Sequence, residues 1–103
     1  MADDVVIVAG TFTVDPARRA EFLDGRLESI RASLEDQGCL EYTMSADAVD
    51  PGAVRLFEMW TSVEDLQAHV QRIRSSPPAE GGVLVLARDM KIYVHAQEQP
   101  FGT

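Results

Sequence analysis

Hydrophobic residues along this 103-residue chain recur with two periods, one typical of β-strands and the other of α-helices. Alternating or β-branched apolar residues predict strands at 5–14, 39–45, 54–61 and 88–96. In the first of these segments both faces are largely apolar, so both sides of the sheet that it joins need to be covered. The apolar segment 83–87 is too short to distinguish a strand from a helical turn.

Two other segments carry apolar residues at helical spacing, and each follows a residue that caps helices. The first helix is predicted to follow Asp15, with Pro16 in its first turn, and to stop at Gly38. Its apolar stripe consists of Ala20, Leu23, Leu27, Ile30 and Leu34. The second helix is predicted to follow Ser62, with Asp65 in the position of a capping-box acid. Its apolar stripe consists of Val63, Leu66, Val70 and Ile73.

The order of these elements is strand, helix, strand, strand, helix, strand, which predicts an α+β fold of the ferredoxin-like βαββαβ kind. In this fold a four-stranded antiparallel sheet carries both helices on one face. Turn-forming residues at 46–52, and the prolines and glycines at 75–82, are expected to interrupt regular structure. Residues 1–103 are therefore expected to form a single domain.

The second face of the predicted sheet has no helix to cover it. Apolar residues occupy both faces of the first and third strands, so an apolar face would be exposed in a monomer. Two copies packed sheet against sheet would cover it, which predicts a homodimer of the dimeric α+β barrel kind. The tail at 97–103 is expected either to be loose or to cross to the partner subunit.

The charge of the chain narrows the range of partners. It has 17 acidic and 9 basic residues and a net charge of -8, which argues against binding to nucleic acid or to an anionic membrane. Its apolar runs are too short for a membrane span or a signal peptide. Cys39 is the only cysteine, so no internal disulfide is expected and a cytoplasmic location is favoured.

Specific residues in the middle of the chain suggest a family. Residues 38–42 read Gly-Cys-Leu-Glu-Tyr, residues 57–62 read Phe-Glu-Met-Trp-Thr-Ser, and Ala68 precedes His69 on the second helix. This resembles the G-C-x-x-Y, E-x-W-x-S and A-H pattern of antibiotic-biosynthesis-monooxygenase domains. The resemblance implies a homodimer with a pocket in each subunit between the sheet and the helices. It also implies oxidation of phenolic polyketides or quinols to quinones by O2, without metal or flavin.

A cofactor-free oxygenation needs a base that makes the substrate an electron-rich anion, and a dry pocket that holds this anion. His69 is the leading candidate for the base, because histidine side chains ordinarily titrate at about pH 6.5 and the helical repeat puts it at the rim of the buried face. Glu58 shares a strand face with Trp60, and it can orient His69 or act as a base itself. The alternatives are a histidine bonded to a backbone carbonyl and a glutamate in an arginine salt bridge.

The candidate substrate-binding residues offer flat, apolar or hydrogen-bonding surface near His69. Trp60 can stack on an aromatic ring, and Tyr42 can donate to a substrate oxygen. Phe12 and Leu66 add apolar surface, and Arg72 can stabilise a negative charge. Structural roles are open for these residues too: core packing for Trp60 and Tyr42, and a solvated helix end for Arg72.

No metal site is expected, because the two histidines lie far apart in the sequence and no Cys-x-x-Cys or His-x-x-x-His spacing occurs. No cofactor is expected either, since phosphate loops and nucleotide fingerprints are absent from the sequence. Three functions stay open. They are a monooxygenase acting on a phenolic, polyketide or quinol-type molecule, a non-catalytic dimer that binds a small aromatic ligand, and an isomerase or cyclase.

Overall fold

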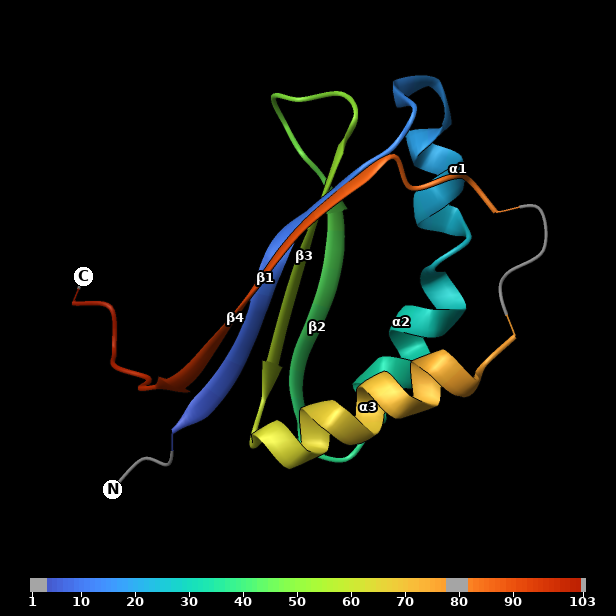
Figure 1. The fold of residues 1–103 in the computed structure, drawn as a ribbon. Coiled ribbons are helices and arrows are strands. Elements are labelled where there is room, and N and C mark those ends of the chain that lie inside the picture. The colour runs from blue at the N-terminus through green and yellow to red at the C-terminus, as the bar shows by residue number, and fades with distance from the viewer. Residues whose placement is uncertain (1–3, 78–81, 103) are drawn as a thin grey trace.

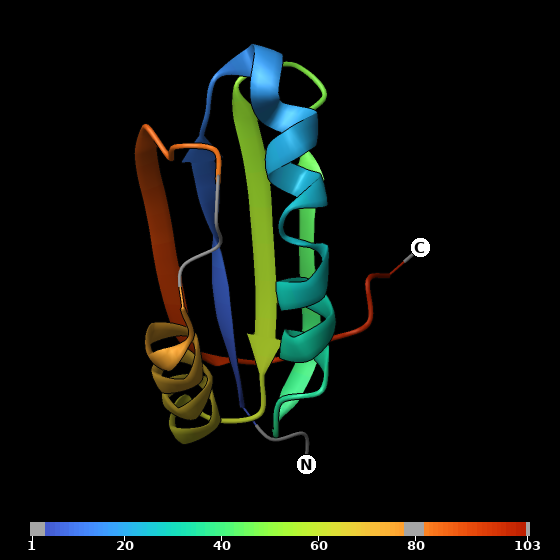
Figure 2. The same ribbon diagram turned by 90° about the vertical axis from the view of Figure 1, so that its right-hand side faces the viewer.

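The structure is a computed structural model that describes residues 4–77 and 82–102. Its elements in chain order are β1 (Val5–Thr13), the 3-10 turn η1 (Pro16–Arg18), α1 (Arg19–Asp24), α2 (Leu27–Leu34), β2 (Cys39–Ala46), β3 (Ala53–Trp60), α3 (Val63–Ser75) and β4 (Ala87–Ala96). The strands form one antiparallel sheet in the order β2-β3-β1-β4. Figures 1 and 2 show the helices together on one face of this sheet, which confirms the ferredoxin-like α+β prediction.

The core lies between the sheet and the helices. Its strand residues are those that alternate toward the helices, such as Val6 and Phe12 of β1, which pair in register with Trp60 and Val54 of β3. From the helices, Phe22 of α1 packs into the same cluster. None of the helices in the described ranges 4–77 and 82–102 combines the length and apolarity needed to cross a membrane.

The first predicted helix is broken, and its predicted apolar stripe is wrong in part. Gly25 ends α1, and α2 begins two residues later. Leu27 and Leu34 of the predicted stripe are 47% and 50% exposed, whereas Phe22 and Ser33 are buried. Phe22 belongs to α1 and Ser33 to α2, so one helical period does not carry the buried stripe across the break at Gly25. The hydroxyl of Ser33 donates a hydrogen bond to the backbone carbonyl of Ser29, which allows this polar residue to be buried.

Gly38 allows the chain to turn from α2 into β2. Its φ is 81°, in the left-handed region that glycine adopts without the steric cost of a side chain. A Cβ at this position would also collide with the carboxylate of Asp65. The glycine of the family-like motif therefore fixes the path of the turn that precedes Cys39.

The segment 83–87, for which the sequence left a strand and a helical turn open, is largely irregular in the structure. Residues 83–86 form neither strand nor helix, although Val83 and Val85 pack against the core. Of the irregular segment expected at 75–82, residues 78–81 lie outside the described residues. Beyond β4, residues 97–102 are exposed, and Figure 1 shows this tail leading away from the sheet.

The sheet face opposite the helices carries apolar side chains. Ile7 lies between Met59 and Tyr93 in the strand register, and Ala9 lies beside Phe57. Tyr93 is exposed, and the other four are half-buried. This is the apolar face that the sequence predicts.

Candidate functional site

Glu58 and His69 are buried in the space between the sheet and the helices. Their exposed fractions are 6% and 5%. Glu58 faces inward because it lies on the same face of β3 as Leu56 and Trp60. His69 faces inward because it follows the buried Leu66 by three residues on α3. The predicted rim position of His69 is therefore wrong: it lies on the most buried side of the helix.

His69 lies between two carboxylates. Its Nδ1 is 2.7 Å from Oδ2 of Asp36, and its Nε2 is 3.8 Å from Oε1 of Glu58. A carboxylate can only accept a hydrogen bond, so Nδ1 is the ring nitrogen that donates to Asp36. In the neutral ring, Nε2 then carries the lone pair and is directed toward Glu58. We call Asp36, His69 and Glu58 the acid–base cluster.

Asp36 is held by Arg72 as well as by His69. It lies in the turn between α2 and β2, and Arg72 of α3 donates to it from Nε at 2.8 Å and from Nη2 at 2.9 Å. Burial opposes the charge on Asp36, but the hydrogen bonds from Arg72 and His69 outweigh it and keep the pKa of this carboxyl below its ordinary value. Asp36 is thus an anion that fixes the orientation of the His69 ring.

Glu58 accepts a hydrogen bond from the indole of Trp60, with 3.0 Å between Nε1 and Oε1. Burial raises the pKa of Glu58, while the bond from Trp60 and the nearby His69 act in the opposite direction. Within the described residues, no arginine lies at ion-pair distance from Glu58, contrary to the salt-bridge alternative. Glu58 can therefore exchange a proton at a higher pH than an exposed glutamate.

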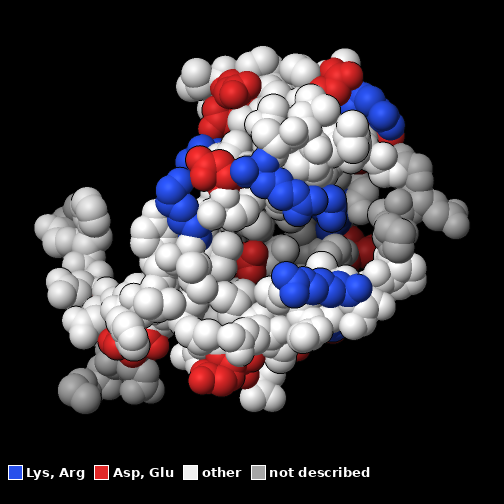
Figure 3. Space-filling view, viewed as in Figure 1, with Lys and Arg blue, Asp and Glu red and all other residues white. Residues whose placement is uncertain are grey.

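A cavity of about 400 Å³ opens beside this cluster, and we call it the main cavity. Its volume lies in the range of about 300–1,000 Å³ that is typical of small-molecule sites. Its lining residues are Val8, Phe12, Arg26, Ser29, Tyr42, Met44, Leu56, Glu58, Leu66, His69, Val70, Ile73, Arg74, Arg88 and Met90. Figure 3 shows a hollow between basic side chains at this place.

Tyr42 brings a hydroxyl group to the cavity wall. Burial, and then the charge of Glu58, raise the pKa of Tyr42 to about 12. The hydroxyl therefore stays protonated near neutral pH and can donate a hydrogen bond to an anionic oxygen. The rings of Tyr42 and His69 are 5.5 Å apart, and both residues line the main cavity.

The structure brings five of the seven predicted site residues to the main cavity: Phe12, Tyr42, Glu58, Leu66 and His69. It does not bring Trp60 and Arg72 there. Trp60 is fully buried beside the His69 ring, at a centroid distance of 4.7 Å, and therefore has no surface for a substrate to stack on. Arg72 is committed to Asp36 and does not line the cavity. Instead, Trp60 contacts Glu58 and His69, and Arg72 contacts Asp36, so both residues hold the acid–base cluster in place.

Asp36 and three arginines that line the cavity are not among the seven site residues predicted from the sequence. A signal for Asp36 was available, since a carboxylate just past the end of a helix is unfavourable next to the negative end of the helix dipole. An acid there, together with Glu35, indicates a compensating partner elsewhere in the fold. The arginines Arg26, Arg74 and Arg88 come from three separate segments of the chain, and no spacing in the sequence connects them.

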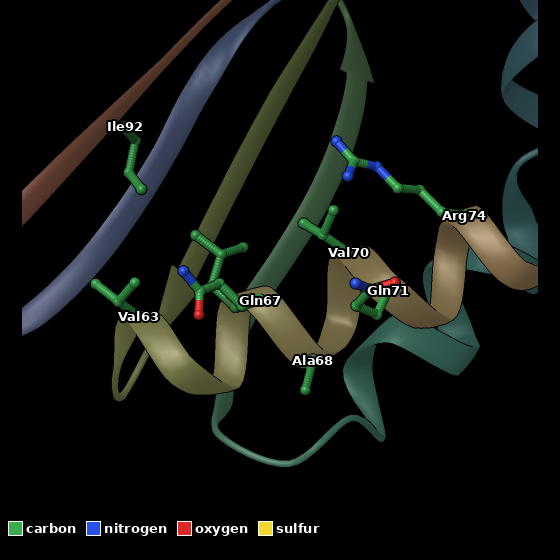
Figure 4. Close-up of a pocket in the computed structure, with 8 residues that line it drawn as sticks. Val63, Gln67, Ala68, Val70, Gln71, Arg74 and Ile92 are labelled. Atoms are coloured by element: carbon green, nitrogen blue, oxygen red, sulfur yellow. The ribbon is translucent and has the colours of Figure 1, made fainter.

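A second groove, of about 570 Å³, runs along α3 next to the main cavity. It shares Leu66, Val70 and Arg74 with the main cavity, and Ile92 of β4 borders its other side. Figure 4 shows Val70 and Arg74 pointing from α3 toward the strands, while Ala68 points away from them. The hollow space therefore continues along the inner side of α3 toward the β4 edge. In the ranges 4–77 and 82–102, no group of three or more His, Cys, Asp or Glu side chains is arranged to hold a metal ion.

Comparisons with known proteins agree with this architecture. The model of the antibiotic biosynthesis monooxygenase family matches residues 5–75. An uncharacterized protein of Synechocystis is 30% identical over 100 residues, which cover 95% of this chain and 68% of that protein. A solved Caulobacter crescentus structure named for the same family has a TM-score of 0.76 at 24% identity, over 93% of this chain and 92% of that chain. One from Nitrosomonas europaea has a TM-score of 0.73 at 15% identity, over 99% and 98% of the two chains.

Proposed function

Because this chain belongs to the antibiotic biosynthesis monooxygenase family, we propose that it oxidises a phenolic, polyketide or quinol-type small molecule with O2 and without a cofactor. The observation that carries the proposal is the acid–base cluster at the wall of a largely apolar cavity. Ground-state oxygen reacts readily with an electron-rich anion, so the protein's task is to make that anion and to keep it dry.

In the proposed reaction, Nε2 of His69 takes the proton of a phenolic hydroxyl, and Asp36 stabilises the imidazolium that forms. The phenolate passes one electron to O2, and the resulting superoxide and phenoxyl radical combine in a carbon–oxygen bond. Loss of water from this peroxide leaves a quinone, so one oxygen atom enters the product and the other leaves in water. Tyr42 donates a hydrogen bond to the phenolate, and Glu58 is a second proton acceptor within reach of His69.

We propose that the working form is a homodimer in the cytoplasm, where the single Cys39 stays reduced. The support for the dimer is the apolar sheet face opposite the helices, formed by Ile7, Phe57, Met59 and Tyr93. Packing this face on its copy would remove these side chains from water. The main cavity lies on the helix side, so it would stay open in such a dimer.

Oxygen uptake by the purified protein, measured against a panel of hydroquinones, anthrones and naphthols, tests the proposed activity. His69→Gln is expected to slow uptake by about 10²–10⁴-fold, the usual contribution of a general base. His95→Gln is the matched control, because His95 also contacts a carboxylate, Asp4 at 3.2 Å, but is exposed and lies outside the cavity. Its uptake should equal that of the wild type.

The same panel separates the alternatives. Unchanged uptake in His69→Gln would remove His69 from the mechanism. Ligand-dependent change in Trp60 fluorescence without any oxygen uptake would identify a non-catalytic binding protein. Product formed in the absence of oxygen would identify an isomerase or cyclase.

A further inference from the structure

Three arginine side chains from three separate segments of the chain line the main cavity. Arg26 lies between α1 and α2, Arg74 lies in the last turn of α3, and Arg88 lies at the start of β4. Arg74 and Arg88 are exposed and Arg26 is half-buried, whereas Glu58 and His69 are buried. The arginines therefore surround the mouth of the cavity, and Glu58 and His69 of the acid–base cluster form its floor. Figure 3 shows the basic side chains on both sides of the hollow.

These three arginines have no carboxylate at ion-pair distance among residues 4–77 and 82–102, although the chain carries 17 acidic residues. Other arginines do have such partners: Arg18 lies 2.7 Å from Glu21, and Arg72 lies 2.8 Å from Asp36. In a protein with a net charge of -8, three positive charges that have no acidic partner among the described residues converge on one cavity. Such a cavity attracts an anion against the overall charge of the chain.

Two of the three guanidinium groups are held in place by aromatic rings. The Cζ atom of Arg26 is 4.8 Å from the centroid of the Phe22 ring, and that of Arg88 is 5.4 Å from the Phe12 ring. Stacking on a ring orients the planar group but leaves its N–H donors available. A carboxylate can accept two parallel hydrogen bonds from such a group. The arginines are thus prepared for an anion before it arrives.

The space between mouth and floor is lined mainly by apolar side chains: Val8, Met44, Leu56, Leu66, Val70 and Met90. Fused aromatic rings suit this wall. At the floor, Glu58 would repel a permanent anion but can accept a proton. The mouth of the cavity therefore favours a negatively charged group, and the floor favours a group that can donate a proton.

We propose that the ligand of the main cavity is a hydroxylated aromatic carboxylic acid, bound with its carboxylate at Arg26, Arg74 and Arg88 and its hydroxyl at His69. The placement of the hydroxyl rests on the proposed function, whereas the carboxylate site stands on the arginines alone. The arginines then select the substrate and fix its direction in the cavity, and the acid–base cluster acts on the opposite end.

Calorimetric titration under argon with three naphthalene probes tests this inference. The probes are 6-hydroxy-2-naphthoate, 2-naphthoate and 2-naphthol. Both acids are expected to bind about ten-fold or more tightly than 2-naphthol at low salt, because charge-assisted bonds to arginine are strong. Raising the ionic strength should weaken the binding of the acids and leave that of 2-naphthol unchanged. Equal affinity for acids and naphthol, or affinity for the acids that salt does not change, would overturn the inference.

Arginine variants locate the carboxylate. Arg74→Gln and Arg88→Gln should each remove most of the preference for the acids, while Arg31→Gln should keep it. Arg31 is the matched control because it is an exposed arginine of α2 that does not line the cavity. An equal loss in all three variants would contradict a site at the mouth. Tight acid binding without oxygen uptake would defeat the proposed function alone, and uptake with neutral hydroquinones but no preference for acids would defeat this inference alone.

Discussion

The covered face of the sheet buries ionisable side chains, whereas the uncovered face presents apolar ones. The face covered by helices buries Glu58 and places it against His69, whereas the uncovered face presents Ile7, Phe57 and Met59. Burial of ionisable groups costs free energy, and so does exposure of apolar groups to water. Both costs are explained if each face binds a partner: a small molecule in the main cavity, and a second copy of the chain on the opposite face.

The largest effect is expected from removing one aromatic side chain on the covered face. Trp60→Ala should lower the free energy of unfolding by about 3–5 kcal/mol, since Trp60 is fully buried and its loss leaves a void and an unpaired Glu58. Urea denaturation at several protein concentrations measures this, and the loss should be the same at each. Phe57→Ala is the counterpart on the opposite face, and its smaller effect should depend on protein concentration. If the loss of unfolding free energy had the same size and the same dependence on protein concentration in both variants, the two faces would not differ in the way described.

A charge on the uncovered face should separate the subunits. Phe57→Arg is expected to raise the dimer dissociation constant by about 30-fold or more, as expected for a central interface residue. Sedimentation velocity at micromolar concentrations measures the change, with Val49→Arg, at an exposed turn position, as the control. A wild-type monomer would contradict the proposed dimer, and a Phe57→Arg dimer would place the contact elsewhere.

On the covered face, Asp36→Asn should slow oxygen uptake by about 10–100-fold, because the neutral amide has only one acceptor oxygen for His69 and Arg72 and no charge to stabilise the imidazolium of His69.

The contribution of Asp36 to the free energy of unfolding should depend on pH. Despite opposing burial, bonds from Arg72 and His69 lower the pKa of Asp36, so its stabilising contribution is present above about pH 4 and is lost as the pH falls through the folded-state pKa. The difference in unfolding free energy between wild type and Asp36→Asn should therefore shrink in acid. A constant difference across pH would contradict this role.

The smallest effect on stability is expected from Glu58→Gln, which keeps an acceptor for the Trp60 indole. Burial raises the pKa of Glu58, so the wild type loses stability as the pH rises from about 4 through the folded-state pKa. Glu58→Gln should match the wild type near pH 4 and be modestly more stable at pH 7, as thermal melting at the two pH values will show. A less stable variant at pH 7 would mean that the charge of Glu58 is stabilised in the fold.

The strands, and the residues that alternate along them, could be predicted from the sequence. Period two indicates which residues share a strand face, so it places Glu58 on the same face as Trp60, but it does not tell which face of the sheet the helices cover. The prediction for the first helix failed at Leu27 and Leu34, because one continuous helical period does not hold across the break at Gly25. Apolar periodicity also misleads where a helix borders a cavity, since polar residues such as Ser29 then face inward.

The partners of the site residues could not be predicted in the same way. The bond between Asp36 and His69 joins a turn to a helix 33 residues later, and no local pattern encodes it. Arg72 was expected at the substrate and lies on Asp36, while Arg74, two residues later, lines the cavity. On a helix, a shift of two residues is a rotation of about 200°, so neighbouring arginines take opposite roles. Only the packing of α3 on the sheet decides which of them meets the cavity.

The central claim is that the acid–base cluster removes a proton from a phenolic hydroxyl, and absorbance under argon tests it without turnover. 2-Naphthol and 6-hydroxy-2-naphthoate are bound at a pH at which both hydroxyls are protonated in free solution, and the naphtholate band is recorded. The band is expected to appear with the wild type and with His95→Gln, and to be lost with His69→Gln. A bound ligand that shows no naphtholate band with the wild type, or the same band with His69→Gln, would contradict the account.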